Sequence, residues 1–355
     1  MSFTTPADFI KALRLHDLLS LEGLMQAERE LLPAAADARQ LAKQLIQRGW
    51  LTVFQVNALF HGQGGELVQG PYRILDRLGE GGVSQVFKAW HVHKKTIVAL
   101  KVLRPELLTN AEALGRFRRE MYALAQSSHP NIVGAIDLDL VGDRTFFAME
   151  YVEGTDLGKL VQLNGPLRAD RGCEYLRQAA LGLQHAHEKG LVHRDIKPAN
   201  LLVTSDGRQV KILDLGLARL RQTADPARYE NDLTVDGSLI GTPDFMSPEQ
   251  ARNPSQADIR SDIYSLGCTF FYAFTGRVPF PSKALIQKVY HHRETPPPTA
   301  SEVRPGLPRE LDAILKRMMA KRPEDRYPQP LAVAQAVAPL AAATAAAQLP
   351  GWLVD

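Results

Sequence analysis

The pattern of hydrophobic residues changes at Tyr72, and this change limits what the chain can fold into. Residues 1–62 show the periodicity of short helices, and glycines over residues 63–71 predict a flexible linker. Tyr72 begins a series of short apolar strands, and after about residue 155 the periodicity is helical again. Strands and helices that are segregated in this way predict an α+β fold, preceded by a small all-α extension.

The elements expected within these regions are short. Thr5 and Thr52 each suit a helix N-cap. Thr5 is followed by a Pro at the first position of the helix, and Thr52 is followed three positions later by a Gln. A further helix is expected over residues 34–48. Strands are expected over residues 72–75, 86–89, 96–100 and 146–152. The extension is predicted either to bind a partner or a second copy, or to dock on the strand-rich lobe, and the pattern leaves both open.

Composition and charge exclude several classes of protein. The 355 residues include 42 Lys plus Arg and 39 Asp plus Glu, a net charge of +3, which argues against a surface built for nucleic acid. Cys173 and Cys268 are too few for a disulfide framework and favour a reducing, cytoplasmic compartment. Residues 1–30 lack the apolar segment of a signal peptide. The apolar stretch 331–348 is Ala-rich and contains Pro339, so no membrane span is expected.

A glycine-rich segment from Gly79 to Val86 follows the first expected strand. Glycines allow a backbone to approach phosphate oxygens closely and to present its N–H groups to them. A dinucleotide-binding fingerprint would need a helix after the glycines, whereas residues 86–89 have the pattern of a strand. The segment therefore predicts a hairpin that covers phosphates, and a hairpin without a ligand is the alternative.

Lys101 follows the apolar strand expected over residues 96–100, where its ammonium group would be partly buried and would need a partner. Glu120, on a helix expected over residues 111–127, is the candidate partner. Such a pair would hold the lysine against phosphate oxygens. The alternative is a lysine whose head group reaches solvent.

Polar side chains are concentrated between two apolar runs at residues 193–200. Asp195 is suited to accept a proton from a hydroxyl nucleophile, and Asn200 offers a neutral oxygen to a hard cation. Lys197 lies between them. Asp214 follows another apolar strand and precedes a glycine, an arrangement that suits Mg²⁺ ligation and is also common in turns.

Together, and in this order, these motifs resemble those of protein kinases. The core of the resemblance is the glycine-rich hairpin, Val-Ala-Leu-Lys at 98–101, Glu120, His-Arg-Asp at 193–195 and Asp-Leu-Gly at 214–216. Further matches are Gly-Thr-Pro at 241–243, Ser-Pro-Glu at 247–249, the helix motif at 261–267 and the closing motif at 321–327, whose Arg326 would pair with Glu249. The helix motif resembles the one that anchors the catalytic loop. Two departures from the usual motifs, Ser84 in place of the third glycine and Ser-Pro-Glu in place of Ala-Pro-Glu, resemble those of bacterial, eukaryotic-like Ser/Thr kinases.

The resemblance implies a bilobal protein kinase fold over residues 72–335. A strand-rich N-lobe would comprise residues 72–152 and a helical C-lobe residues 153–335. Residues 336–355 would form an Ala-rich C-terminal tail.

The resemblance also implies transfer of the γ-phosphoryl group of ATP, bound with Mg²⁺ or Mn²⁺, to Ser or Thr hydroxyls of proteins. The implied catalytic residues are Asp195, Lys197, Asn200, Lys101 and Glu120, and the implied metal ligands are Asn200 and Asp214. The implied nucleotide contacts are Leu78, Gly79, Glu80, Gly81, Gly82, Val83, Ser84, Gln85, Val86, Ala99, Lys101, Met149, Glu150, Val152, Leu202 and Asp214.

The resemblance further implies a role in bacterial signal transduction, with autophosphorylation of Thr234, which lies eight residues before Thr242. Asp236 would supply a fixed negative charge beside it. A pseudokinase-type scaffold without phosphoryl transfer is the main alternative, and a small-molecule kinase of related fold is the third. The active enzyme is favoured because all six residues expected to serve nucleotide, metal and proton are present.

Overall fold

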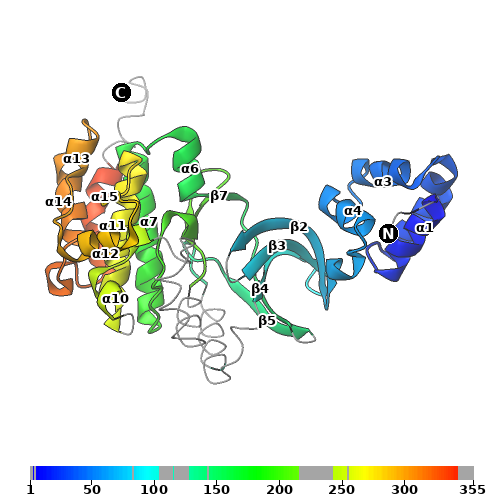
Figure 1. Ribbon diagram of the computed structural model, residues 1–355, viewed down its shortest axis with the longest axis horizontal. Helices are drawn as coiled ribbons and strands as arrows, with labels where there is room; N and C mark the ends of the chain where they lie inside the picture. The colour runs from blue at the N-terminus through cyan, green and yellow to red at the C-terminus, as the bar shows by residue number, and fades with distance from the viewer. Residues whose placement is uncertain are drawn as a thin grey trace, which may run out of the picture. The chain divides into compact units, whose positions relative to one another are not determined.

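The computed structural model of the protein contains two compact units. The first comprises Met1–Glu106 and Ile136–Tyr151, and the second comprises Leu107–Ala135 and Val152–Asp355. In Figure 1 the N-terminal helices and the first strands are drawn in blue to cyan, and the last helices in yellow to red. The structure describes residues 3, 5–81, 84–103, 115, 128–141, 144–215, 243–253 and 256–342.

The first unit is built on a six-stranded sheet with the order β1-β2-β3-β4-β6-β5. Its strands are β1 (Val68–Gln69), β2 (Tyr72–Gly81), β3 (Ser84–His91), β4 (Thr96–Leu103), β5 (Ala135–Val141) and β6 (Arg144–Glu150). The expected hairpin is confirmed, because β2 and β3 pair through Gly79 with Val86 and through Glu80 with Gln85. The strand expected over residues 146–152 is shifted by two residues and ends at Glu150.

Four α-helices precede the sheet: α1 (Pro6–Leu15), α2 (Leu21–Gln26), α3 (Ala38–Gln47) and α4 (Val53–Phe60). The predicted N-caps at Thr5 and Thr52 are confirmed, and each belongs to a complete capping box. The helix expected over residues 34–48 instead begins at Ala38. Its N-cap is Asp37, whose side chain accepts a hydrogen bond from the backbone N–H of Gln40, whereas Leu32–Ala34 form a separate 3₁₀ turn.

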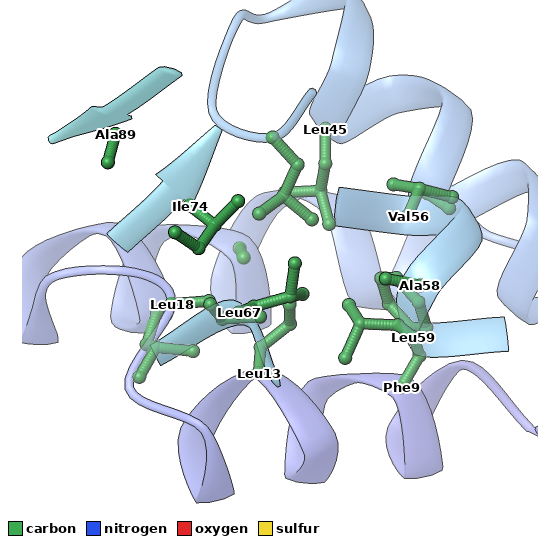
Figure 2. Close-up of a cluster of buried hydrophobic side chains, with 14 of the residues drawn as sticks. Phe9, Leu13, Leu18, Leu45, Val56, Ala58, Leu59, Leu67, Ile74 and Ala89 are labelled. Carbon is green, nitrogen blue, oxygen red and sulfur yellow. The ribbon is translucent and has the colours of Figure 1, made fainter. Parts of the chain in front are cut away.

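The helices of the extension and the sheet share one hydrophobic core. Figure 2 shows side chains from both in a single cluster, among them Phe9, Leu13, Leu45, Leu59, Ile74 and Ala89. Each of these side chains is at most 2% exposed. Full burial of a Leu or Phe stabilises a fold by about 1.5–3 kcal/mol, so this cluster is a substantial part of the unit's stability. The extension is thus docked on the sheet in this structure, while its binding to a partner stays a prediction.

The segment expected as a flexible linker, residues 63–71, is structured and forms a 3₁₀ turn (Gly64–Leu67) followed by β1. Leu67 is 1% exposed and lies in the shared core. A Cβ at Gly64 would lie 2.4 Å from the His16 ring. That glycine therefore permits a close approach, and the anchored leucine removes the flexibility that the glycine content predicted.

The second unit is mainly helical and carries a small sheet with the order β7-β8-β9. Its strands are β7 (Gly154–Asp156), β8 (Leu201–Thr204) and β9 (Val210–Ile212). Its helices are α6 (Leu157–Asn164), α7 (Ala169–Glu188), α10 (Pro248–Arg252), α11 (Ile259–Thr275), α12 (Leu285–Glu294), α13 (Ala300–Val303), α14 (Arg309–Met318) and α15 (Pro330–Ala342). The apolar runs after Asn200 and before Asp214 form β8 and β9, in agreement with the sequence pattern, whereas β7 and the pairing of the three strands into a sheet were not expected.

Helix α11 is buried along almost its whole length. Cys173 and Cys268 are both free and buried, and burial raises the pKa of each thiol to about 12.

Among the residues that the structure describes, no helix is long and apolar enough to cross a membrane.

A buried polar cluster joins α11, α12 and the segment after α14. The Tyr264 hydroxyl lies 2.9 Å from His292 Nδ1, and Lys321 Nζ donates to the carbonyl oxygens of His291 and His292. The Lys321 ammonium also lies 4.3 Å from the centre of the Phe280 ring. Burial, reinforced by the charge of Lys321, lowers the pKa of His292 to about 3.

The unfolding free energy of the wild type is expected to fall as pH drops from about 6.5 toward about 3, in part because of His292. The unfolded state binds a proton at this histidine over that window and the folded state does not, so acid favours unfolding. In His292→Asn, which keeps an acceptor for Tyr264, the decline should be shallower. Urea unfolding at several pH values measures this, and equal slopes for both proteins would contradict the prediction.

Candidate active site

Lys101 lies on one face of the first unit's sheet, and it is only 3% exposed. The strand register places Val86 opposite Lys101 on one side and Phe147 on the other, and it pairs Ala99 with Met149. Residues two apart on a strand share a face, so these side chains lie together. We call this surface the lysine face.

The glycine-rich hairpin is formed by β2 and β3, and β3 pairs in turn with β4, which carries Lys101. Leu78, Gly79 and Glu80 are exposed at the end of β2, and Gln85 follows on β3. Gly81 pairs with Ser84 to complete the ladder. Gly82 and Val83 lie outside the described residues.

Three of the predicted catalytic side chains converge in the second unit. Lys197 Nζ donates to Asp195 Oδ2 at 2.9 Å. Asn200 Nδ2 donates to the Asp195 carbonyl oxygen at 2.7 Å and lies 3.2 Å from Asp195 Oδ2. The side chains of Asp195 and Lys197 are 24% and 18% exposed. The carboxylate is therefore held in place and still open to a substrate hydroxyl.

The backbone of this loop is fixed by Asp262 on α11. Its two carboxylate oxygens accept the backbone N–H groups of His193 and Arg194, each at 2.7 Å. Burial raises the pKa of Asp262, while His193 and the two amide bonds act in the opposite direction. Gln250 Nε2 donates to the Arg194 carbonyl at 2.8 Å, and Arg194 has a positive φ of 64°. The loop is thus anchored on both sides of a strained residue.

Replacing Asp262 by asparagine should lower both the thermal midpoint and the catalytic rate. An asparagine retains one acceptor and turns an amide group toward the second backbone N–H, and a buried donor without a partner costs about 1–3 kcal/mol. Asp258→Asn is the matched control, because Asp258 caps the same helix and asparagine is an equally good cap. An Asp262→Asn variant that melted and turned over like the control would contradict this.

Asp214 is brought to the loop by the backbone before it. The Leu213 N–H donates to the Asn200 carbonyl at 2.9 Å, and the Leu213 carbonyl lies 2.7 Å from His193 Nε2. Asn200 precedes β8 and Asp214 follows β9, and these strands pair antiparallel, so their adjacent ends bring the two residues together. Asp214 has a positive φ of 59°.

The donor atoms at this point fit a hard divalent cation. Asn200 uses Nδ2 for its bonds to Asp195, which makes Oδ1 the atom suited to a metal ion. An amide oxygen and the Asp214 carboxylate are the kinds of ligand that Mg²⁺ prefers, completed in proteins by water and substrate phosphate. The residues present therefore fit Mg²⁺.

A buried ion pair between Glu249 and Arg326 lies in the same unit as the loop. Both oxygens of Glu249 accept from the Arg326 guanidinium, at 2.7 and 2.8 Å, as the sequence predicted. The other donors of Arg326 reach the carbonyl oxygens of Ala320, Arg260 and Lys321. Burial alone would raise the pKa of Glu249, but the hydrogen bonds and charge of Arg326 outweigh it and lower the pKa.

The remaining predicted site residues are placed unevenly. Glu150 ends β6, Val152 follows it closely, and Leu202 lies on β8, all partly buried. Glu120, the expected partner of Lys101, lies outside the described residues, as do Thr234, Asp236 and Thr242. Gln250 is a loop anchor that the sequence motifs did not indicate. The signal that could have found it is the Ser247–Gln250 capping box, which places a second amide group near the loop.

Comparison with known families matches residues 72–337 to the protein kinase domain. The chain belongs to the protein kinase family. This protein kinase is 38% identical over 262 residues to the serine/threonine-protein kinase PknB of Mycobacterium tuberculosis, which covers 72% of this chain and 40% of PknB. It is 36% identical over 268 residues to the serine/threonine-protein kinase pkn3 of Myxococcus xanthus, covering 74% of this chain and 48% of pkn3. The chain thus spans less than half the length of these curated relatives.

The solved structures agree with the sequence comparison. The crystal structure of the Mycobacterium tuberculosis PknI kinase domain matches this protein kinase with a TM-score of 0.60 and 26% sequence identity. That match covers 77% of this chain and 97% of the PknI domain. The kinase fold and the resemblance to bacterial, eukaryotic-like Ser/Thr kinases are therefore confirmed.

Proposed function

We propose that this protein kinase transfers the γ-phosphoryl group of ATP to Ser or Thr hydroxyls of proteins. The observation that carries the proposal is the cluster of Asp195, Lys197 and Asn200, in which a partly exposed carboxylate is oriented by an ammonium group and an amide. Phosphoryl transfer depends mainly on positioning and charge neutralisation, and this cluster supplies both.

In the first unit, Lys101 is the proposed ligand of the ATP phosphates. Its burial on the lysine face favours a fixed position, because a buried ammonium group must be held by partners. The backbone N–H groups of the Gly79–Val86 hairpin would cover the phosphates, and Ala99 and Met149 would lie against the adenine. Glu120 is the proposed partner of Lys101.

In the second unit, Asp195 would accept the proton of the substrate hydroxyl, and Lys197 would steady the transferred phosphoryl group. Asn200 Oδ1 and the Asp214 carboxylate would hold Mg²⁺. Bound Mg²⁺ neutralises charge on the phosphate oxygens. Asp262 and Gln250 keep the loop backbone in place, and so are positioning residues.

The names of the relatives support Ser and Thr as acceptors, since PknB and pkn3 are both called serine/threonine-protein kinases. Lys197 supports the same choice by resemblance. A scaffold without activity is less favoured, because Lys101, Asp195, Lys197, Asn200 and Asp214 are all retained. Autophosphorylation at Thr234 and the cytoplasmic location remain predictions.

The test is transfer of labelled γ-phosphate from ATP by the full chain, with Mg²⁺ and Mn²⁺ compared. A generic protein acceptor and a set of free sugars and aminoglycosides would be offered in parallel, and phosphorylated residues mapped. Label on Ser or Thr, including Thr234, is the expected result. Label on the small molecules would favour the small-molecule kinase, and ATP binding without transfer under either metal would favour the scaffold.

A further inference from the structure

Strand β2 is irregular just before the glycine-rich hairpin. Its register with β3 runs from Ile74 opposite Ala89 to Asp76 opposite Lys88, so Leu75 is an extra residue in β2. A second shift between Arg77 and Gly79 makes Leu78 extra in the same way. Bulges bend a strand and increase its twist, so these two set the direction in which the hairpin continues.

The helical extension binds three consecutive residues of β2 at this point. The Arg73 guanidinium pairs with the Asp17 carboxylate and donates through Nε to the Asp17 carbonyl at 2.9 Å. Gln55 Nε2 donates to the Ile74 carbonyl at 2.8 Å, in a buried hydrogen bond.

The third of these residues, Leu75, is bound at the bulge itself. The hydroxyl of Thr52 donates to the carbonyl of Leu75, the residue that the register skips. The first bulge is therefore held from the extension.

The residues that hold the bulge are also the capping box of α4. The Thr52 hydroxyl accepts from the Gln55 N–H at 3.1 Å, and Gln55 Oε1 accepts from the Thr52 N–H at 2.9 Å. Each side chain thus uses its acceptor for the helix and its donor for β2. Gln55 is 3% exposed, which protects its bonds from competition with water.

The extension reaches the sheet from the face opposite the lysine face. Ile74, Ala89 and Val98 are aligned across β2, β3 and β4 and face the extension in the shared core. Lys101 lies an odd number of residues from Val98 on β4, so its side chain points the other way. Phe54 of α4 contacts Phe87 on this same far side, with ring centres 6.2 Å apart. The extension can therefore act on β2 without contacting a nucleotide.

We propose that Thr52 and Gln55 are positioning residues for nucleotide binding, which fix the bulge of β2 and thereby the place of the hairpin from Gly79 onward. The helical extension then sets the affinity of the kinase for ATP. This inference rests on the proposed function, because it assumes that the hairpin covers the phosphates of ATP.

Four variants of the full chain test it. Thr52→Val removes the hydroxyl at nearly constant volume, and Thr52→Ser restores it. Gln55→Glu keeps the oxygen that the capping box needs and loses the N–H donor to Ile74. Thr5→Val is the matched control. Thr5 forms the exposed capping box of α1 with Asp8, so this substitution removes a helix cap elsewhere in the extension.

Three quantities are measured: the dissociation constant of a non-hydrolysable ATP analogue with Mg²⁺, the KM for ATP against kcat, and hydrogen exchange of the amides at residues 77–81. Thr52→Val and Gln55→Glu should weaken analogue binding roughly three- to tenfold, the effect of one buried hydrogen bond. They should raise KM with little change in kcat and speed exchange at residues 77–81. Thr52→Ser and Thr5→Val should bind the analogue within twofold of the wild type.

Analogue binding in Thr52→Val and Gln55→Glu that matches the wild type would overturn the inference. So would an equal loss in Thr5→Val, because that would reflect general loosening of the extension. Analogue binding and exchange do not require phosphoryl transfer. A wild type that binds the analogue and transfers nothing would therefore refute the proposed function alone, and one that binds no analogue would refute both.

Discussion

The Asp195→Asn variant is expected to transfer phosphate roughly 10²–10⁴-fold more slowly than the wild type, the usual contribution of a general base. Asparagine has almost the same shape and retains an oxygen to accept the bond from Lys197, but it cannot take up the substrate proton. Asp195 is partly exposed, so the fold should persist. Single-turnover rates at saturating ATP measure the effect directly.

Two controls separate loss of chemistry from loss of structure. Asp206→Asn makes the same chemical change in an exposed turn between β8 and β9, where Asp206 accepts from Thr204 and the Arg208 N–H, and it should retain the wild-type rate. ATP-analogue affinity and thermal midpoint of Asp195→Asn should match the wild type. A rate within a few-fold of the wild type would show that Asp195 is not the base.

The Arg326→Met variant is expected to lose about 3–5 kcal/mol of unfolding free energy in the second unit. Removing one partner of a buried ion pair leaves the charge of the other, here Glu249, uncompensated. The Arg326 side chain is fully buried, and its loss also strands three backbone carbonyl oxygens. Urea unfolding followed by a probe in the second unit would measure the change, since the two units need not unfold together.

The matched control lies in the same motif. Arg322 pairs with Glu324 at the surface, with 73% and 53% of their side chains exposed, and Arg322→Met should leave the midpoint unchanged. A double variant, Glu249→Leu with Arg326→Met, should recover part of the loss, because it removes the stranded charge. Equal midpoints for Arg326→Met and Arg322→Met would contradict the prediction.

The same pair also gives a pH dependence with a defined sign. The folded pKa of Glu249 is below its unfolded value, so the pair contributes stability above about pH 4.5 that is lost as pH falls through the folded pKa. This contribution should be absent from the Arg326→Met variant, which should therefore lose less stability on acidification than the wild type does.

Local signals in the sequence predicted the elements whose formation depends on neighbouring residues. The N-cap at Thr5 and the capping box at Thr52 were predicted correctly because the residues that form them lie within three positions of each other. The sequence did not reveal that the helix starts after Asp37. The alanines before Asp37 have a high helix propensity, so they extended the predicted helix toward the N-terminus. The glycines of residues 63–71 predict a flexible joint, whereas the Gly64–Leu67 turn owes its order to distant core residues that no local pattern indicates.

The family and the order of its motifs can be read from the sequence alone, since each motif carries its chemistry within a short stretch and the set is specific. The pairing of Glu249 with Arg326, which lie 77 positions apart, was expected only through the family resemblance. The packed structure was needed to show which backbone groups Asp262 and Gln250 hold, and that the Thr52 capping box also holds the bulge in β2. These contacts join residues that are 19 to 69 positions apart. Hydrogen bonds over such separations form only when packing of the core brings the elements together, so no local pattern records them.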